Sequence, residues 1–121
     1  MKEKVLAVAL LIILPLAVIL NTIILTAQIN ETINAINSVK IEESGAKGKA
    51  ESIFEDFSRK ESFLSLTVSH DDLTNIEDCF TEMIGYLSVG DTKNAEVMRN
   101  RLIHSLEHLR RLSGFNIDAI I

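Results

Sequence analysis

Residues 5–30, VLAVALLIILPLAVILNTIILTAQIN, carry no charged side chain, and residues 5–20 are almost entirely Val, Ala, Leu and Ile. An α-helix rises about 1.5 Å per residue, so this stretch would extend roughly 39 Å as a helix. That length is enough to cross a hydrocarbon core of about 30 Å. The sequence therefore predicts one membrane-spanning helix over residues 5–28, preceded by a short cytoplasmic tip at residues 1–4.

The basic tip determines the expected orientation of this helix. Lys2 and Lys4 lie directly before the apolar run, and the first basic residue after it is Lys40. Because basic flanks stay in the cytoplasm, residues 29–121 are expected to be extracytoplasmic at the cell membrane. The run is longer than the apolar core of a cleaved secretory signal, which favours an uncleaved signal anchor. Cleavage after Ala27 is the alternative that the sequence leaves open.

Three residues inside the apolar run have further consequences. Pro15 removes one backbone hydrogen bond and is expected to bend the helix in the membrane. Asn21 and Thr22 place polar groups in the run. They indicate either a position near the outer interface, which is the favoured interpretation, or a contact with another membrane helix.

The composition after the anchor limits the class of protein. About ninety residues remain, enough for one small domain, and from Gln28 onward ten Lys or Arg stand against sixteen Asp or Glu. An acidic surface binds nucleic acid poorly, so no nucleic-acid partner is expected. The single cysteine, Cys79, excludes an internal disulfide. The scarcity of Gly, Pro and aromatic residues favours an all-α fold over a β-sandwich.

Apolar residues at helical spacing predict four helical segments beyond the bilayer: residues 29–43, which continue the membrane helix as a stalk, then 47–68, 72–88 and 92–113. The expected inner faces are Ile29, Ile33, Ile36 and Val39; Ala50, Ile53, Phe54, Phe57, Leu64 and Val68; Leu73, Ile76, Phe80, Met83 and Leu87; and Ala95, Met98, Leu102, Leu106, Leu109 and Leu112. Residues 44–48 are expected to form a turn, and His70-Asp71-Asp72 to supply the N-cap of the third helix. Gly90 suits a C-cap and Asp91 the next N-cap, so the small bundle should end in an antiparallel helix hairpin.

One segment matches a metal motif. His104-Ser105-Leu106-Glu107-His108 has the H-x-x-E-H pattern of inverted zincins. A catalytic zinc needs a third protein ligand, however, and only thirteen residues follow His108. We therefore expect no catalytic, cofactor-binding or metal site, with His104, Glu107 and His108 as weak metal candidates. Cys79 is expected to be a packing residue.

Several segments of the chain occur in a recognisable order. A membrane helix and a second helix precede His70, and Asp72-Leu73-Thr74-Asn75-Ile76-Glu77, Gly90-Asp91, Leu106-Glu107-His108-Leu109 and Asn116-Ile117 follow. This order resembles the bacterial family catalogued as domain of unknown function 4363, whose recurrent positions would be His70, Ile76, Glu77, His108, Asn116 and Ile117. Members often carry a tryptophan in the second helix, where this chain has Phe54 or Phe57. The resemblance implies a small membrane-tethered helical protein, beside another membrane protein, with no known chemistry.

These patterns predict a non-enzymatic accessory subunit of a membrane complex. Its extracytoplasmic module would bind a membrane-protein partner or a second copy through the apolar stripes of the second and third helices, because a domain of this size has a marginal core. The alternative is a membrane-tethered bundle that senses a ligand or a cation. His70-Asp71-Asp72 could then form a cation-sensitive or pH-sensitive corner.

Overall fold

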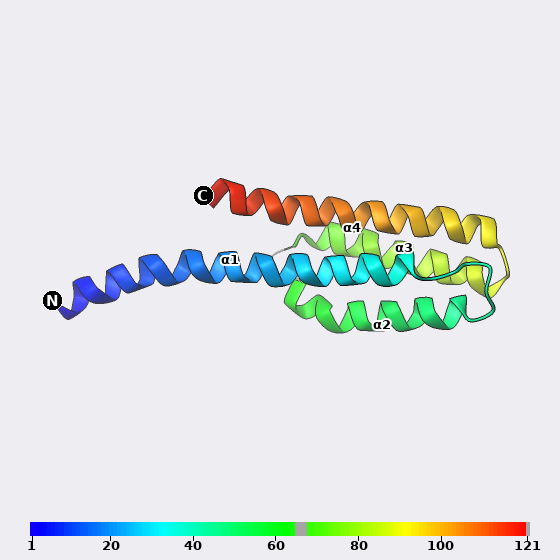
Figure 1. The fold of residues 1–121 in the computed structure, drawn as a ribbon, viewed down its shortest axis with the longest axis horizontal. Helices are drawn as coiled ribbons and strands as arrows, with labels where there is room; N and C mark the ends of the chain where they lie inside the picture. Colours follow the sequence, from blue (N-terminus) through cyan, green and yellow to red (C-terminus); the bar gives the residue numbers. More distant parts are fainter. Residues whose placement is uncertain (65–67, 121) are drawn as a thin grey trace.

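The computed structural model describes residues 1–64 and 68–120, with side chains described for residues 1–61 and 68–112. The described part is all-α, as predicted, with four helices: α1 (Lys2–Asn37), α2 (Ala46–Leu64), α3 (His70–Ser88) and α4 (Thr92–Ile120). The helices run alternately up and down, and α1 and α3 each pack against both α2 and α4. Figure 1 shows the resulting bundle, from which the N-terminal part of α1 projects.

α1 joins two different environments in one uninterrupted helix. It has 36 residues and continues through Pro15. The large apolar side chains between Val5 and Ile24 are mostly exposed, whereas a buried stripe in the bundle runs from Leu25 to Ile36. The prediction that the apolar helix continues beyond residue 28 is confirmed. The continuation is not a separate stalk, however, because Ile29, Ile33 and Ile36 belong to the core of the bundle.

The exposed part of α1 has the length of a membrane crossing. Among the described residues, α1 is the one helix long and apolar enough to span a membrane, by its length and composition, and only 11% of its most apolar stretch is buried. Residues 5–24 rise about 30 Å, which equals the typical thickness of a hydrocarbon core. A core helix of a water-soluble bundle would have most of this stretch covered.

α1 ends at Asn37, before the predicted end at residue 43, and the predicted turn at residues 44–48 falls at 38–45. Val39 and Ile41, two residues apart, are both buried in a small second cluster at this end of the bundle. A continued helix could not bury both, because residues two apart face different directions. Arg99 of α4 donates from Nη1 to the Val39 carbonyl at 2.7 Å, a partner that lies outside α1.

The expected inner faces of α2 and α3 pack against each other. Phe80 stacks on Phe54 with ring centroids 4.9 Å apart and lies tilted against Phe57 at 5.6 Å. The predicted residues that are buried are Ala50, Phe57, Leu73, Ile76, Phe80 and Met83, with Ile53, Phe54, Val68 and Leu87 partly buried. The side chain of Leu64 lies outside the described residues. Because these stripes are used inside the bundle, they do not offer the free partner surface that the sequence predicted.

The N-cap of α3 is Ser69 and not the predicted His70-Asp71-Asp72. The Ser69 hydroxyl accepts from the Asp72 N–H at 3.2 Å and donates to Asp72 Oδ2 at 2.8 Å. A serine hydroxyl caps a helix about as well as a carboxylate does, and α3 begins at His70, two residues before its predicted start at residue 72. His70 becomes the exposed first residue of the helix.

The turn between α3 and α4 confirms its prediction. Gly90 has a φ of +75°, a conformation that favours glycine. Asp91 caps α4, because its Oδ1 accepts from the Asn94 N–H at 3.2 Å and its Oδ2 accepts from Asn94 Nδ2 at 2.7 Å. α4 then returns antiparallel to α3, as Figure 1 shows.

Two predictions for α4 are wrong. Its predicted inner residues are buried from Ala95 to Leu109, but Leu112 is 42% exposed. The helix also continues to Ile120 instead of ending at residue 113. A glycine inside a helix costs about 1 kcal/mol, so the Ser-Gly pair at 113–114 does not have to end it.

Candidate functional site

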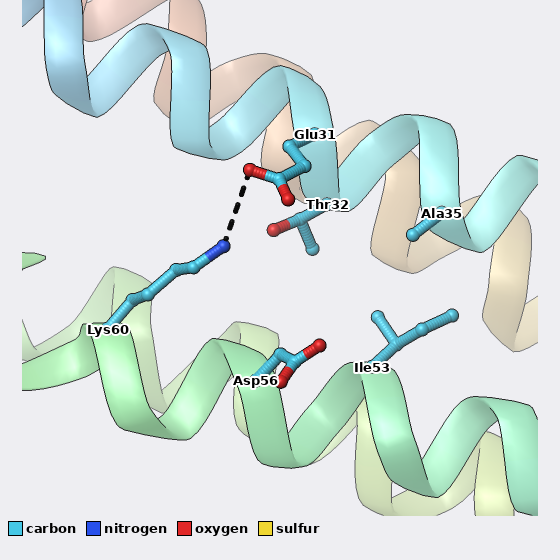
Figure 2. A pocket seen from close by; sticks show the side chains of 6 residues that line it. All are labelled: Glu31, Thr32, Ala35, Ile53, Asp56 and Lys60. Atoms are coloured by element: carbon cyan, nitrogen blue, oxygen red, sulfur yellow. Dashed lines mark ion pairs between the residues drawn. The ribbon is translucent and has the colours of Figure 1, made fainter.

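A belt of polar contacts surrounds α1 just above its exposed apolar part. We name as the polar belt Asn30 and Glu31 of α1, Asp56 and Lys60 of α2, and Arg110 of α4. Arg110 Nη1 donates to Asn30 Oδ1 at 2.7 Å, in a partly buried contact between α4 and α1. Lys60 Nζ lies 3.5 Å from Glu31 Oε2, which links α2 to α1 (Figure 2). The belt therefore joins α1 to both of its neighbours at one level.

A small notch opens between α1 and α2 inside this belt. It has a volume of about 40 Å³ and is lined by Glu31, Thr32, Ala35, Ile53, Asp56 and Lys60. Figure 2 shows Lys60 reaching across the gap toward Glu31, with Asp56 and Thr32 facing each other beside that pair. A polar space of this size suits about one water molecule.

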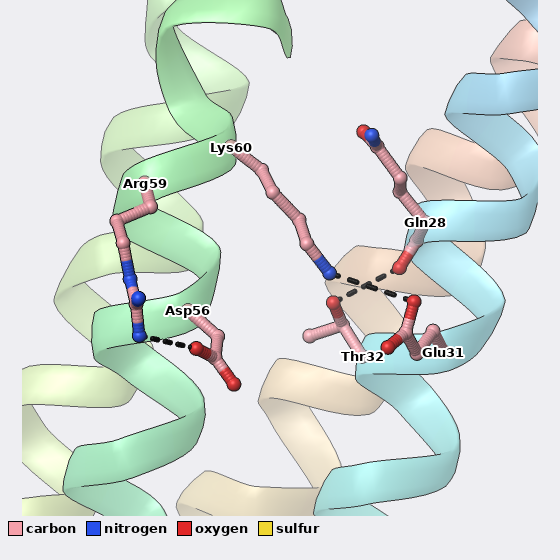
Figure 3. Close-up of polar contacts among 6 residues, drawn as sticks. All are labelled: Gln28, Glu31, Thr32, Asp56, Arg59 and Lys60. Atoms are coloured by element: carbon pink, nitrogen blue, oxygen red, sulfur yellow. Dashed lines mark hydrogen bonds and ion pairs between the residues drawn. The ribbon is translucent and has the colours of Figure 1, made fainter.

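Two side chains that line the notch form hydrogen bonds within their own helices. The Thr32 hydroxyl donates to the Gln28 carbonyl at 3.0 Å, and Arg59 Nη2 donates to Asp56 Oδ1 at 2.6 Å (Figure 3). Gln28 Oε1, by contrast, is buried without a hydrogen-bond partner. Buried carbonyl oxygens of this kind are normally satisfied by ordered water. The α1–α2 side of the belt is therefore polar.

A second polar place lies between α3 and α4. A surface hollow of about 260 Å³ is lined by Asp72, Asn75, His104, Ser105 and His108. Asn75 Nδ2 donates to Ser105 Oγ at 3.0 Å across it. Of the three residues in the predicted H-x-x-E-H motif, the two histidines line this hollow and Glu107 does not. Among the described residues, no three His, Cys, Asp or Glu side chains converge closely enough to hold a metal ion together.

Glu77 lies on the side of α3 that faces α2. A hydrogen bond with the Glu61 carboxyl raises the pKa of Glu77, and partial burial and the negative charges of Glu61 and Asp78 act in the same direction. The positive charge of His70 partly opposes this rise in pKa. The raised pKa of Glu77 is therefore an electrostatic property of the α2–α3 surface.

Cys79 is a buried free cysteine, as predicted. Burial raises the pKa of its thiol, and Arg101 and Ser105 only partly oppose this effect. A neutral, covered thiol is a poor nucleophile and a poor metal ligand. Cys79 therefore acts as a packing residue in the core.

Of the positions named from the family resemblance, those with described side chains lie in different surroundings. Ile76 is buried in the core, whereas His70 and His108 are exposed. Asn116 and Ile117 lie outside the residues whose side chains are described. The polar belt was missed from the sequence, because Asn30 and Arg110 are 80 residues apart and each is an ordinary helical surface residue when considered alone.

No protein-family model matches this chain, and the searches of curated proteins and of solved structures likewise found no significant match. The resemblance to domain of unknown function 4363 therefore stays a prediction.

Proposed function

We propose that this chain is a single-pass membrane protein whose extracytoplasmic four-helix module serves as an accessory subunit beside another membrane protein. One observation carries the proposal: α1 supplies both the exposed apolar segment of residues 5–24 and a buried stripe of the bundle core. A bundle that shares a helix with its anchor is held at the bilayer surface. The basic residues Lys2 and Lys4 favour a cytoplasmic N-terminus.

The proposed contact with the partner lies in the membrane segment. The stripes of α2 and α3 are buried, so residues 5–24 of α1 form the largest apolar surface left exposed. Thr22 is turned inward, and its hydroxyl donates to the Val18 carbonyl at 2.9 Å. The half-buried Asn21 has no such bond among the described residues. An amide in this position favours a hydrogen bond to a neighbouring membrane helix, of about 1 kcal/mol.

We also propose that the protein is not an enzyme. His104 and His108 line a hollow whose walls do not include Glu107, the glutamate that would serve as base in an inverted zincin. The notch of the polar belt is small, with a volume of about 40 Å³. The supported role is therefore attachment and contact.

The orientation and the partner can be tested together in native membranes. External protease on spheroplasts should digest residues 29–121 and spare the membrane segment. A photo-crosslinking side chain at Leu20, exposed on α1, should give a protein adduct of defined mass. The matched control is the same side chain at Val97, exposed on α4 in the bundle. A mature chain that begins after Ala27 in the medium, or adducts from Val97 alone, would contradict the proposal.

A second candidate function is cation sensing by the tethered bundle. It is favoured by the two imidazoles that face the hollow between α3 and α4. A thermal-shift screen of the full chain distinguishes the two functions, since a ligand that binds the folded state raises the midpoint of unfolding.

A further inference from the structure

The hollow between α3 and α4 has the side chains of a small metal site. Its walls carry two imidazoles, His104 and His108, and one carboxylate, Asp72. We propose that it binds one divalent transition-metal ion of the zinc, nickel and copper class, with the imidazoles as direct ligands. Asp72 would act through a metal-bound water.

The helix sets the spacing of the two imidazoles. His104 and His108 are four residues apart on α4, which places their Cβ atoms about 5–6 Å apart on one face. An ion about 2.0–2.1 Å from one nitrogen of each ring can bridge that spacing. Both side chains are exposed, and neither forms a hydrogen bond or ion pair with a described residue. Binding an ion therefore breaks no existing contact.

Asp72 is placed to act from a distance. Its Oδ2 accepts from the Ser69 hydroxyl at 2.8 Å, which holds the carboxylate at the start of α3. No three metal-binding side chains of the described residues converge on one point, so Asp72 does not reach the ion directly. A hollow of about 260 Å³ has room for an ion and several waters, at about 30 Å³ for each water. A carboxylate that accepts from a metal-bound water is a common outer-shell partner.

The ligand set selects the class of ion. Imidazole nitrogen suits zinc, nickel and copper, whereas magnesium and calcium prefer oxygen ligands. Glu107, the glutamate of the H-x-x-E-H motif, does not line the hollow, and Asp72 is the carboxylate beside the two imidazoles. The bound ion would therefore exchange with ions in solution and would link α4 to the first turn of α3.

The test is a calorimetric titration of Zn²⁺ into the full chain in detergent, purified without a histidine tag. We expect saturation at one ion per chain, with no corresponding heat from Mg²⁺. His104→Ala and His108→Ala should each weaken Zn²⁺ binding by about tenfold or more, because each removes a direct ligand. His70→Ala, which removes the third exposed histidine of the chain, is the matched control and should leave the affinity unchanged.

The role of Asp72 is tested with a matched pair of variants. Asp72→Asn should weaken Zn²⁺ binding by about tenfold, the lower limit for outer-shell partners. Asp71→Asn, one residue away and outside the hollow, should leave it unchanged. The three histidine variants should melt at the parent temperature without metal, whereas Asp71→Asn and Asp72→Asn should each melt slightly lower, because both remove negative charge from the first turn of α3. Where a variant melts lower without metal, the change in melting midpoint on adding Zn²⁺ is compared instead. The proposal then requires that Zn²⁺ raise the midpoint of the parent and of His70→Ala by more than it raises the midpoint of that variant.

Two results would overturn the proposal: Zn²⁺ affinity unchanged in His104→Ala, or an equal loss in His70→Ala. Neither result would affect the proposed membrane anchoring, because the titration does not depend on the orientation of α1.

Discussion

α1 packs against α4 on one side and against α2 on the other, and these two contacts, here called its seams, differ in their chemistry. Toward α4, α1 makes its more extensive helix contact, and the partly buried Arg110–Asn30 hydrogen bond closes the seam. Toward α2, the seam contains a polar notch, and its ion pair joins side chains that are 30% (Lys60) and 74% (Glu31) exposed. The helix farthest from α1 in the sequence therefore holds it more firmly than the adjacent one.

This difference leaves α2 dependent on α3. The stack of Phe80 on Phe54, with Phe57 against the same ring, is the apolar contact that holds α2 in the bundle. The Lys60–Glu31 pair on the other side of α2 contributes little by comparison, because exposed ion pairs are screened by solvent. The strength of the α2–α3 contact thus compensates for the weak α1–α2 seam.

The largest expected effect on stability comes from removing the Phe80 ring from the contact between α2 and α3. Phe80→Ala should lower the free energy of unfolding by about 3–5 kcal/mol, because the side chain is fully buried and leaves a cavity among aromatic neighbours. Urea unfolding of the full chain in detergent measures this change. Val97→Ala, at a side chain that is 57% exposed, is the control and should stay within about 0.5 kcal/mol. A Phe80→Ala variant that unfolds like the parent would show that α2 is held elsewhere.

The buried face of α3, which packs against α2, was predictable from the sequence. Leu73, Ile76, Phe80 and Met83 repeat at helical spacing, and burial of one helix face follows from that repeat alone. The turn at Gly90 and Asp91 was predictable for a similar reason, since the residue types carry the backbone preference and the cap. Local periodicity and local chemistry thus determined most of the architecture.

The polar contacts were not predictable, because they depend on which helices become neighbours. Arg110 meets Asn30 only after α4 has docked on α1, and no local pattern in either helix marks the pair. The same limit applies to the hollow, where Asp72 replaces Glu107 as the acid beside His104 and His108. The early end of α1 has a similar origin, because Val39 and Ile41 leave the helix to reach a cluster that contains Ala95 of α4.

An intermediate effect is expected at the firm seam. Arg110→Met keeps most of the aliphatic stem but removes the charged donor, which leaves the Asn30 amide oxygen without its partner. We expect a loss of about 1–3 kcal/mol in the free energy of unfolding. Arg111→Met, at the exposed neighbouring arginine, makes the same change in charge and should have almost no effect. Equal losses from both variants would mean that net charge, and not the seam, is responsible.

The smallest effect is expected at the α1–α2 seam. Lys60→Met removes the ion pair with Glu31, and a double-mutant cycle with Glu31→Gln should give a coupling energy of about 0.2–1 kcal/mol that decreases in high salt. Lys47→Met with Glu51→Gln is the matched cycle, because that pair lies within α2 at 3.6 Å and connects no helices. Similar coupling in both cycles is expected if the notch adds nothing to an ordinary surface pair. A salt-independent coupling between Lys60 and Glu31, as large as the loss in Arg110→Met, would instead make the two seams equivalent.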